Sequence, residues 1–388
     1  MVSSRPTRGR ILTVLNYYRP YVSGLSEYAR LIAEGAASRG FSVTVLTGKH
    51  RTDLPALEIV NGVRIVRANP LIFVHKGYVS LQLFARFRSE IGSADLAHFH
   101  LPMPESGPLS LLCGRSVPLL ATYQCDVARS RSGSLIDALA VKVVHESCRI
   151  CLRRARSVVV SSLDYASGSE VLGGTADKWV EIPPPDKGSR TPPGLSTGGE
   201  KMRVGFLGRF VEEKGIDVLL DAAPLVLRRL PGVQFMLAGN FTTVAGGGEY
   251  QRLNGRIGAL GAGVQLPGPI AEEQLQDFYS SLDVLVLPSV NSYEAFGMVQ
   301  LEAMKAGVPV VASDMRGVRI PVRRTGNGIL VPPGNAPALA DAIVEVLTEP
   351  RFRARREIFD RACTAFPPDH AVDRYVEMYS TLIESRRA

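Results

Sequence analysis

Residues 284–312 read VLVLPSVNSYEAFGMVQLEAMKAGVPVVA. The stretch begins with a short apolar run, Val284–Leu287, which is typical of a buried strand. A loop containing Gly297 follows, then a helical segment at Gln300–Ala306 and a second apolar run at Val308–Ala312. A strand, a helix and a strand in close succession indicate parallel strands whose sheet is covered by helices. The stretch therefore predicts an α/β fold.

The same alternation extends in both directions and forms two blocks. In the first block the predicted strands are Ile11–Leu15, Phe41–Leu46, Val63–Val66, Leu96–Phe99, Leu119–Tyr123 and Ser157–Val160. In the second block they are Val204–Leu207, Val233–Ala238, Val284–Leu287 and Val308–Ala312. Proline and glycine recur between Ile182 and Met202, which is typical of a linker.

We therefore predict two Rossmann-like doubly wound domains, at residues 1–185 and 202–369, joined by a linker at 186–201. A last helix is expected at 370–388, and packing back on the N-terminal domain is one arrangement that we consider. Ligands of doubly wound sheets bind beyond the carboxyl ends of the strands. We accordingly expect the two domains to face each other across a cleft that holds the site.

The composition is that of a folded protein without a membrane span. The chain has 388 residues, of which 45% are hydrophobic and 21% charged, and no apolar stretch approaches the ~20 residues of a spanning helix. Ile11–Leu15 is too short for the apolar segment of a signal peptide. We therefore expect a cytoplasmic protein.

The net charge is +8, from 45 basic and 37 acidic residues. No compact run of Lys and Arg with interleaved aromatics occurs, which argues against nucleic acid as a partner. Peripheral contact with an anionic membrane, at its inner face, and plain solubility both stay open. The five cysteines have no framework spacing, and we interpret Cys148 and Cys151 as two small apolar residues on a helix.

The most specific motif runs from Glu294 to Glu302. Phe296-Gly297 forms a loop that opens a helix, where glycine permits close approach of a ligand and free N–H groups favour a pyrophosphate. Glu294 precedes the helix, so its carboxylate can accept hydrogen bonds from sugar hydroxyls. Glu302 lies about a turn and a half inside the helix, placed to accept both hydroxyls of a ribose.

These residues resemble the E-x7-E motif of the retaining GT-B glycosyltransferases of family 4, the glycosyl transferases of group 1. The resemblance implies that Glu294 holds the donor sugar, that the backbone of Phe296 and Gly297 contacts sugar and phosphate, and that Glu302 binds the ribose. It is strongest from Met202 to Pro333, the part that binds the donor nucleotide in this family. It is weaker from Ile11 to Ser162, the part that shapes the acceptor site.

A second motif, Gly208-Arg209 followed by Lys214-Gly215, lies in a predicted strand–loop–helix segment. Arg can clamp a diphosphate through two parallel hydrogen bonds, and Lys adds a compact positive charge. Arg209 and Lys214 would neutralise the charge that builds on a departing nucleoside diphosphate. The family has the same Gly-Arg…Lys-Gly pair at this place.

The first loop, after Ile11–Leu15, contains Pro20, Ser23 and Gly24. The family usually has a Gly-Gly there, whose backbone approaches the donor phosphate or the acceptor. Gly24 still permits that approach, whereas Ser23 departs from the pattern and adds a hydroxyl.

Two histidines lie on one side of a predicted strand, at His98 and His100. No third ligand accompanies them, so we do not expect a metal site. The segment resembles the family's H-x-H, and this implies that His100 reaches the acceptor side and orients the acceptor hydroxyl, while His98 is a core residue. Gln124 stands where the family often has His; an amide cannot act as a base, and we expect it to hydrogen-bond the acceptor.

The chain has no D-x-D, no P-loop and no nucleophile elbow, so we expect neither a metal nor a cofactor beside the nucleotide sugar. Retention by double displacement requires a carboxylate on the far face of the sugar, and no residue suggests itself. The resemblance implies front-face substitution instead. Family frequency favours a UDP-linked donor, and GDP stays open. The catalytic set would be His100, Arg209, Lys214 and Glu294.

Two other classes of protein share this architecture. A nucleotide-sugar epimerase or a phosphorylase would use a similar site without needing the pairing of Glu294 with Glu302. A non-catalytic two-lobed sugar-binding protein would usually carry a secretion signal. The acceptor, whether a saccharide, a lipid-linked saccharide or a small metabolite, cannot be read from the sequence.

Overall fold

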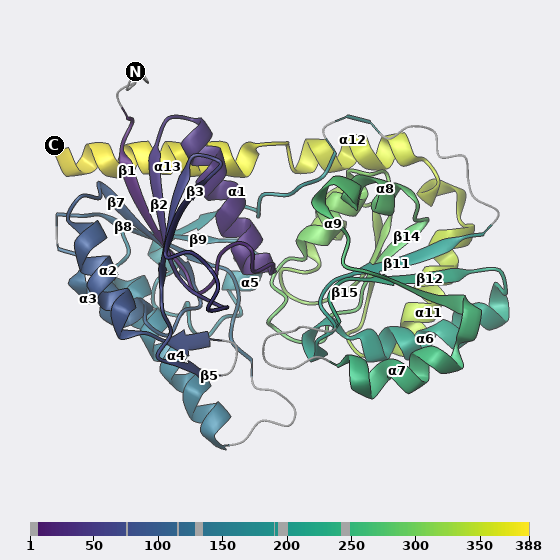
Figure 1. The fold of residues 1–388 in the computed structure, drawn as a ribbon. Coiled ribbons are helices and arrows are strands. Elements are labelled where there is room, and N and C mark those ends of the chain that lie inside the picture. The colour runs from purple at the N-terminus through teal and green to yellow at the C-terminus, as the bar shows by residue number, and fades with distance from the viewer. Residues whose placement is uncertain are drawn as a thin grey trace. The chain divides into compact units, whose positions relative to one another are not determined.

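The computed structural model describes residues 7–74, 77–114, 116–128, 135–189, 191–192, 201–241 and 249–387. The chain divides into two compact units, each described here by itself (Figure 1). Unit 1 comprises Met1–Pro185 and Asp369–Ala388, and unit 2 comprises Asp186–Pro368. Most of the predicted linker at 186–201 lies outside the described residues.

Within the described residues, unit 1 contains an eight-stranded sheet in the order β10-β9-β8-β7-β1-β2-β4-β3, parallel except for β3. Its strands are β1 (Arg10–Val14), β2 (Ser42–Gly48), β3 (Leu57–Val60), β4 (Val63–Ala68), β7 (Leu96–Leu101), β8 (Leu119–Tyr123), β9 (Ser157–Val160) and β10 (Trp179–Glu181). A separate hairpin pairs β5 (Ile72–Val74) with β6 (Gly77–Val79). The helices are α1 (Gly24–Ser38), α2 (Leu81–Ile91), α3 (Ser106–Leu112), α4 (Leu135–Arg154), α5 (Leu163–Ala166) and α13 (His370–Arg387).

Unit 2 has a parallel sheet, six-stranded in its described part, in the order β13-β12-β11-β14-β15-β16. Its strands are β11 (Arg203–Leu207), β12 (Gln234–Ala238), β13 (Val264–Gly268), β14 (Val284–Leu287), β15 (Val310–Ser313) and β16 (Gly328–Val331). The helices are α6 (Ile216–Arg229), α7 (Tyr250–Ala259), α8 (Leu275–Ser280), α9 (Met298–Met304), α10 (Ile320–Thr325), α11 (Ala336–Thr348) and α12 (Arg355–Ala365).

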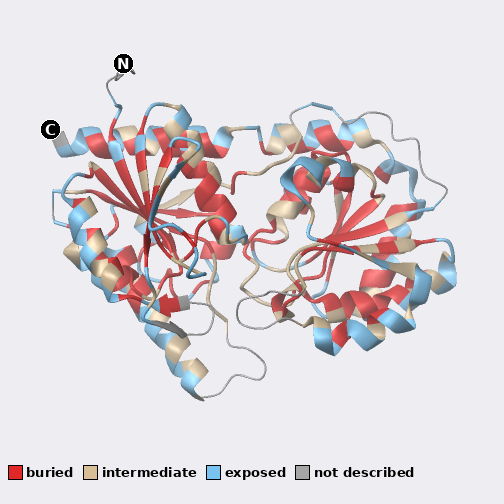
Figure 2. Ribbon diagram, viewed as in Figure 1, coloured by how far each residue is buried: buried red, intermediate tan, exposed pale blue. Residues whose placement is uncertain are grey.

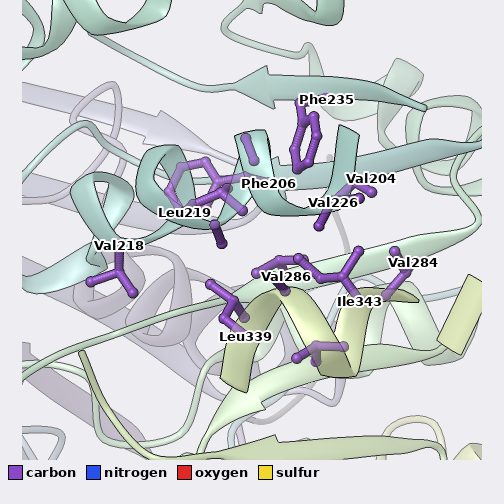
Figure 3. Packing of buried hydrophobic residues seen from close by; sticks show 14 of the residues in the cluster. Val204, Phe206, Val218, Leu219, Val226, Phe235, Val284, Val286, Leu339 and Ile343 are labelled. Carbon is purple, nitrogen blue, oxygen red and sulfur yellow. The ribbon is translucent and has the colours of Figure 1, made fainter. Parts of the chain in front are cut away.

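The core of unit 2 shows why these segments fold as they do. The central strands β14 and β15 are buried on both faces because helices cover the parallel sheet, which accounts for their continuous apolar runs. Figure 3 shows Phe206 of β11 and Val286 of β14 packed against Leu219 of α6 and Leu339 of α11. Figure 2 shows the same arrangement in both units, with buried strands at the centre and exposed residues on the outer faces of the helices.

Helix α13 belongs to unit 1 and is attached to its sheet by buried hydroxyl groups. Tyr375 Oη lies 3.0 Å from Tyr28 Oη and 2.7 Å from Thr122 Oγ1. His98 joins the same network through Tyr379 Oη at 2.8 Å and Thr122 Oγ1 at 2.7 Å. His98 is therefore a core residue with both ring nitrogens occupied, as the sequence predicted.

The predicted linker starts as a packed segment. Asp186 Oδ2 lies 2.8 Å from Nζ of Lys305, whose side chain is 1% exposed. A Cβ on Gly188 would come too close to both of these side chains. The first residues after Pro185 therefore belong to unit 2 and lie against the residue that follows α9.

The strand order places a topological switch point in each sheet. In unit 1 the chain passes from β1 to β2 on one side and later returns to β7 on the other side of β1. In unit 2 it passes from β11 to β12 and later returns to β14 on the other side of β11. Loops diverge at such points, and ligands of open α/β sheets bind there. No helix in the described part of the chain is both long and apolar enough to cross a membrane.

Candidate functional site

At the switch point of unit 2 two loops are in direct backbone contact. One loop leads from β11 through a short 3-10 turn, Glu212–Lys214, into α6, and the other leads from β14 into α9. Gly215 has φ 64°, and a Cβ there would overlap the carbonyl oxygen of Pro288. The amide of Val290 also donates to the carbonyl of Glu213 at 3.1 Å. Only glycine permits both this left-handed conformation and this close approach.

The contact brings Lys214 and Glu294 together although they are far apart in the sequence. Lys214 Nζ donates to Glu294 Oε2, and the two side chains are only 18% and 12% exposed. A charge-assisted hydrogen bond that is largely shielded from solvent holds both groups in fixed positions. Lys214, the predicted leaving-group cation, and Glu294, the predicted sugar-binding carboxylate, therefore form a salt-bridged pair.

Arg209 lies on the same loop as Lys214. Its Nη2 is 3.6 Å from Oε1 of Glu213, which is buried, while Arg209 itself is 27% exposed. The preceding Gly208 donates its amide to the carbonyl of Ala238 at 3.0 Å, and a Cβ on Gly239 would overlap the Gly208 carbonyl oxygen. The backbone of the Gly208–Arg209 segment is thus fixed against the end of β12, with a partly exposed guanidinium.

Phe296 and Gly297 lie in the loop that precedes α9, and this loop is held in place by buried contacts. The ring of Phe296 is buried and lies 5.9 Å from the ring of Phe366, so a ligand can reach only its backbone. Gly297 has φ 80° and directly precedes α9. The side chain of Gln300 donates to the carbonyls of Phe296 at 2.7 Å and Val318 at 2.9 Å, which fixes the loop. The sequence motif did not single out Gln300.

Glu302 lies inside α9 and is buried. Its Oε2 accepts a hydrogen bond from the hydroxyl of Tyr279 on α8 at 2.6 Å. Burial raises the pKa of Glu302, and the hydrogen bond from Tyr279 counteracts this; the charge of Asp186 raises the pKa further, and Lys187 lowers it. Tyr279 orients the carboxylate and was not identified from the sequence, because nothing on a helix marks a tyrosine as a partner of a distant glutamate.

In unit 1 the loop after β1 ends in a capping box. Ser23 is the N-cap of α1: its Oγ accepts from the Ser26 amide at 3.2 Å, and its amide donates to Ser26 Oγ at 2.8 Å. The hydroxyl of Ser23 is therefore engaged in the protein's own structure. Gly24 is exposed, and a Cβ there would meet no atom within 4 Å. The packing of unit 1 does not require glycine at this position.

His100 is fully buried at the end of β7, next to Gln124. Gln124 Nε2 lies 3.0 Å from His100 Nδ1 and also 3.4 Å from the carbonyl of Leu25. A carbonyl can only accept, so the amide nitrogen of Gln124 faces both groups, and His100 Nδ1 acts as acceptor. The proton of the neutral ring is then on Nε2, which has no partner among the described residues. His100 can donate a hydrogen bond there but cannot take up a proton as a base.

Two family models match the chain, one in each unit. Residues 23–185 match the glycosyl transferase 4-like domain, and residues 192–362 match the glycosyl transferases of group 1. A phosphatidyl-myo-inositol mannosyltransferase from Mycobacterium leprae is 31% identical over 356 residues, covering 89% of each chain. The chain is a group 1 glycosyltransferase of the GT-B type.

Solved structures agree with this glycosyltransferase in fold. The sucrose-phosphate synthase from Thermosynechococcus elongatus aligns with a TM-score of 0.79 at 24% identity, covering 97% of this chain and 100% of that one. HepE from Anabaena, in complex with UDP-glucose, aligns with a TM-score of 0.71 at 19% identity over 97% of this chain and 100% of that one. At such identities the likeness concerns the fold alone.

The glycosyltransferase shows no group of three or more His, Cys, Asp or Glu side chains suited to a metal ion within its described residues. His98 and His100 are close, with ring centroids 4.2 Å apart, but His98 is occupied on both nitrogens. Cys148 and Cys151 are buried free thiols, and burial raises their pKa.

Burial lowers the pKa of His100 to about 3, which leads to a prediction about acid stability. The unfolded chain binds a proton at this histidine below pH ~6.5 while the folded chain does not, so stability falls as the pH falls. Between pH 7 and pH 5 we expect His100 alone to reduce the free energy of unfolding of unit 1 by about 2 kcal/mol.

The measurement is denaturant unfolding at the two pH values, followed by the fluorescence of Trp179, the single tryptophan, which lies in β10 of unit 1. The comparison variant is His100→Asn, whose amide oxygen can replace Nδ1 as acceptor for Gln124. Wild type should lose about 2 kcal/mol more than the variant between pH 7 and pH 5. Equal losses would show that His100 is not held neutral by the fold.

Proposed function

We propose that this glycosyltransferase binds a nucleoside diphosphate hexose at the β11/β14 switch point and transfers the hexose, with retention of configuration and without a metal, to a hydroxyl of its acceptor. The observation that carries the proposal is the shielded salt bridge between Lys214 and Glu294 at the place where α/β sheets bind ligands. It joins a cation suited to a diphosphate to a carboxylate suited to sugar hydroxyls.

In the proposed reaction the acceptor hydroxyl enters on the face from which the diphosphate leaves. Arg209 and Lys214 stabilise the negative charge that develops on the leaving group, the role that a metal takes in other transferases. A phosphate oxygen of the leaving group takes the proton of the acceptor. His100 cannot take it at Nε2, so its proposed role is to donate a hydrogen bond that orients a substrate hydroxyl.

The remaining donor contacts follow the motif. Glu294 accepts hydrogen bonds from the hexose, the backbone of Phe296 and Gly297 contacts sugar and phosphate, and Glu302, oriented by Tyr279, binds the ribose. Gly208 permits a phosphate oxygen close to its backbone, and Gly24 permits close approach of either the donor phosphate or the acceptor. Among these, Gly24 has open space around its α-carbon in unit 1, which supports its part in the proposal.

The donor nucleotide is proposed to be UDP, and GDP is the alternative. The relatives bear on the sugar: those from Mycobacterium and an O-antigen chain enzyme from Escherichia coli are named mannosyltransferases. A mannosyl donor therefore belongs among those tested. The acceptor is proposed to be a hydroxyl-bearing saccharide, a lipid-linked saccharide or a small metabolite, with Gln124 and Ser23 on its side of the reaction.

The proposal is tested by titrating UDP-glucose, UDP-N-acetylglucosamine and GDP-mannose into the protein by calorimetry, without and with a chelator. We expect one of them to bind equally well in both conditions, and its sugar to be transferred to an acceptor with the anomeric configuration of the donor, as followed by NMR. Turnover of the nucleotide sugar without acceptor to an isomer, or turnover only with inorganic phosphate, would identify an epimerase or a phosphorylase instead. Binding without any turnover would identify a binding protein.

Lys214→Ala should lower turnover at least tenfold, since a fixed cation near the leaving diphosphate stabilises the transition state by more than about 1.4 kcal/mol. The matched control is Lys201→Ala, which removes an exposed lysine of the same unit and should leave turnover unchanged. Steady-state rates over a range of donor concentrations give kcat and kcat/KM for the comparison. A kcat/KM of Lys214→Ala within about twofold of wild type would refute the assigned role.

We further propose that α4 of unit 1 contacts an anionic membrane surface. Ile136, Leu139, Val143 and Ile150 recur along one stripe of the helix and are 77%, 62%, 55% and 37% exposed. Figure 2 shows exposed and intermediate residues along much of α4. Lys142, Arg149 and Arg153 lie along one side of the stripe, where Arg149 is paired with Glu146, and the chain carries a net charge of +8. An apolar stripe beside basic residues suits the interface of a bilayer with anionic headgroups.

Co-sedimentation with vesicles tests this contact. Wild type should bind vesicles containing phosphatidylglycerol, bind pure phosphatidylcholine vesicles much less, and be released by salt. Val143→Glu should weaken binding at least about fivefold, whereas Ile59→Glu, at an apolar residue on β3 that is even more exposed, should not. Equal binding of the two variants would remove α4 from the proposal.

A further inference from the structure

Four aromatic side chains gather at the switch point of unit 1. Tyr17 is at their centre: its ring centroid lies 4.9 Å from that of Tyr21, 5.4 Å from that of Tyr78 and 6.2 Å from that of His50. Tyr21 and His50 are 5.4 Å apart. Tyr17 and Tyr21 follow β1, His50 follows β2, and Tyr78 lies in β6. Tyr17 and Tyr78 are buried, while Tyr21 and His50 are partly exposed and connect the group to solvent.

Glu105 lies beside these rings, in the loop that follows β7. Its carboxyl group is buried, and neither oxygen accepts a hydrogen bond from another described residue. Burial raises the pKa of Glu105 to about 7, although the residue's own backbone amide partly counteracts this. The charge of Glu105 in turn raises the pKa of Tyr17 and Tyr78, after the larger effect of their own burial, so the carboxylate is close to both phenols.

Three further polar atoms in the same place have no partner among the described residues: Asn16 Oδ1, His50 Nδ1 and Tyr78 Oη. Buried polar atoms are almost always hydrogen-bonded, and a buried carboxylate without a partner is costly. A concentration of five such atoms, counting both oxygens of Glu105, indicates groups that are satisfied by something other than the chain itself.

The backbone connects these residues into one structure. Asn16 Nδ2 donates to the carbonyl of Pro102 at 3.4 Å, which joins the β1 loop to the β7 loop. The amide of Gly48, the last residue of β2, donates to the carbonyl of Asn16 at 3.0 Å. Tyr78 packs on Gly48 so closely that any Cβ there would overlap its ring. The unpartnered atoms therefore sit on loops that are fixed to one another at the carboxyl ends of three adjacent strands.

We propose that the acceptor subsite of this glycosyltransferase is the cluster of Asn16, Tyr17, Tyr21, His50, Tyr78 and Glu105, and that it binds an uncharged polyol ring, a sugar or a cyclitol. The inference rests on the proposed function and adds the chemical class of the acceptor. Glu105 accepts hydrogen bonds from neighbouring hydroxyls, Asn16 accepts another, and Tyr78 and His50 supply groups that can donate or accept. The rings of Tyr17 and Tyr21 offer apolar faces to the C–H groups of the polyol.

The carboxyl group of Glu105 also disfavours negatively charged ligands in this cluster. Burial lowers the pKa of His50 and two nearby arginines lower it further, but both arginines are already paired with carboxylates, Arg51 with Asp53 and Arg67 with Glu58. A phosphate on the bound ring would in addition face the buried carboxyl group of Glu105, which repels it when ionised. We therefore expect a charged or lipid substituent of the acceptor to lie away from Glu105, and the part held beside Glu105, Tyr17 and Tyr78 to be a neutral ring with adjacent hydroxyls.

Ligand-observed saturation-transfer NMR tests the proposal without donor or turnover. The probes are myo-inositol, methyl α-D-mannoside and inorganic phosphate, each at millimolar concentration with the full chain. We expect transfer to at least one of the two polyols and none to phosphate. Glu105→Gln and Tyr78→Phe should each lower the polyol affinity at least about tenfold, whereas Glu170→Gln, at an exposed glutamate of unit 1, should not.

Folding of the variants is checked by Trp179 fluorescence, and Glu105→Gln should resist denaturant at pH 8 at least as well as wild type because it removes a buried unpaired charge. Failure of both polyols to bind, preference for phosphate, or equal binding by wild type and Glu105→Gln would each overturn the subsite. These results are independent of the proposed transfer, which fails only if no nucleotide sugar is bound and used. When transfer is measured, Glu105→Gln should raise the acceptor KM and leave the calorimetric donor affinity unchanged.

Discussion

The candidate site depends on one backbone contact, that of Gly215 with the carbonyl of Pro288. Any side chain at Gly215 would separate the loop after β11 from the loop after β14. With glycine there, the loops touch, and Lys214 and Glu294 form their shielded salt bridge. The parallel pairing of β11 with β14 brings the two loops to the same edge of the sheet, and glycine at φ 64° lets them close. The order of the strands and one residue without a side chain thus determine where the charged groups meet.

The two units use the same position in their sheets for different chemistry. At the switch point of unit 2, Lys214 and Arg209 provide positive charge beside a carboxylate, a combination that suits a phosphorylated ligand with a sugar. At the switch point of unit 1, the buried carboxyl group of Glu105 has no hydrogen-bond partner among the described residues and lies among phenol rings, while the arginines near His50 are already paired with carboxylates. This arrangement suits a neutral ligand rich in hydroxyls. The chemical difference between the two places agrees with a division between donor and acceptor.

The sequence predicted most of the central strands because they are buried on both faces and read as apolar runs, as at Leu119–Tyr123. It did not predict the edge strands β3, β10, β13 and β16, which are short, partly exposed or interrupted by Gly and Pro. Lys214 and Glu294 were found because their loops carry motifs. Tyr279, Gln300 and Glu105 were not, because what distinguishes them is a tertiary partner, or the lack of one, and no local pattern records that.

Hydrogen exchange followed by mass spectrometry tests the central claim most directly, since it locates a ligand on the chain. Saturating nucleoside diphosphate should slow exchange of the amides in two segments, residues 208–215 and 289–299, and should do so less in a Lys214→Ala variant. Binding that is evident by calorimetry but slows exchange only elsewhere in the chain would contradict the assignment of the donor site to the meeting point of these two loops.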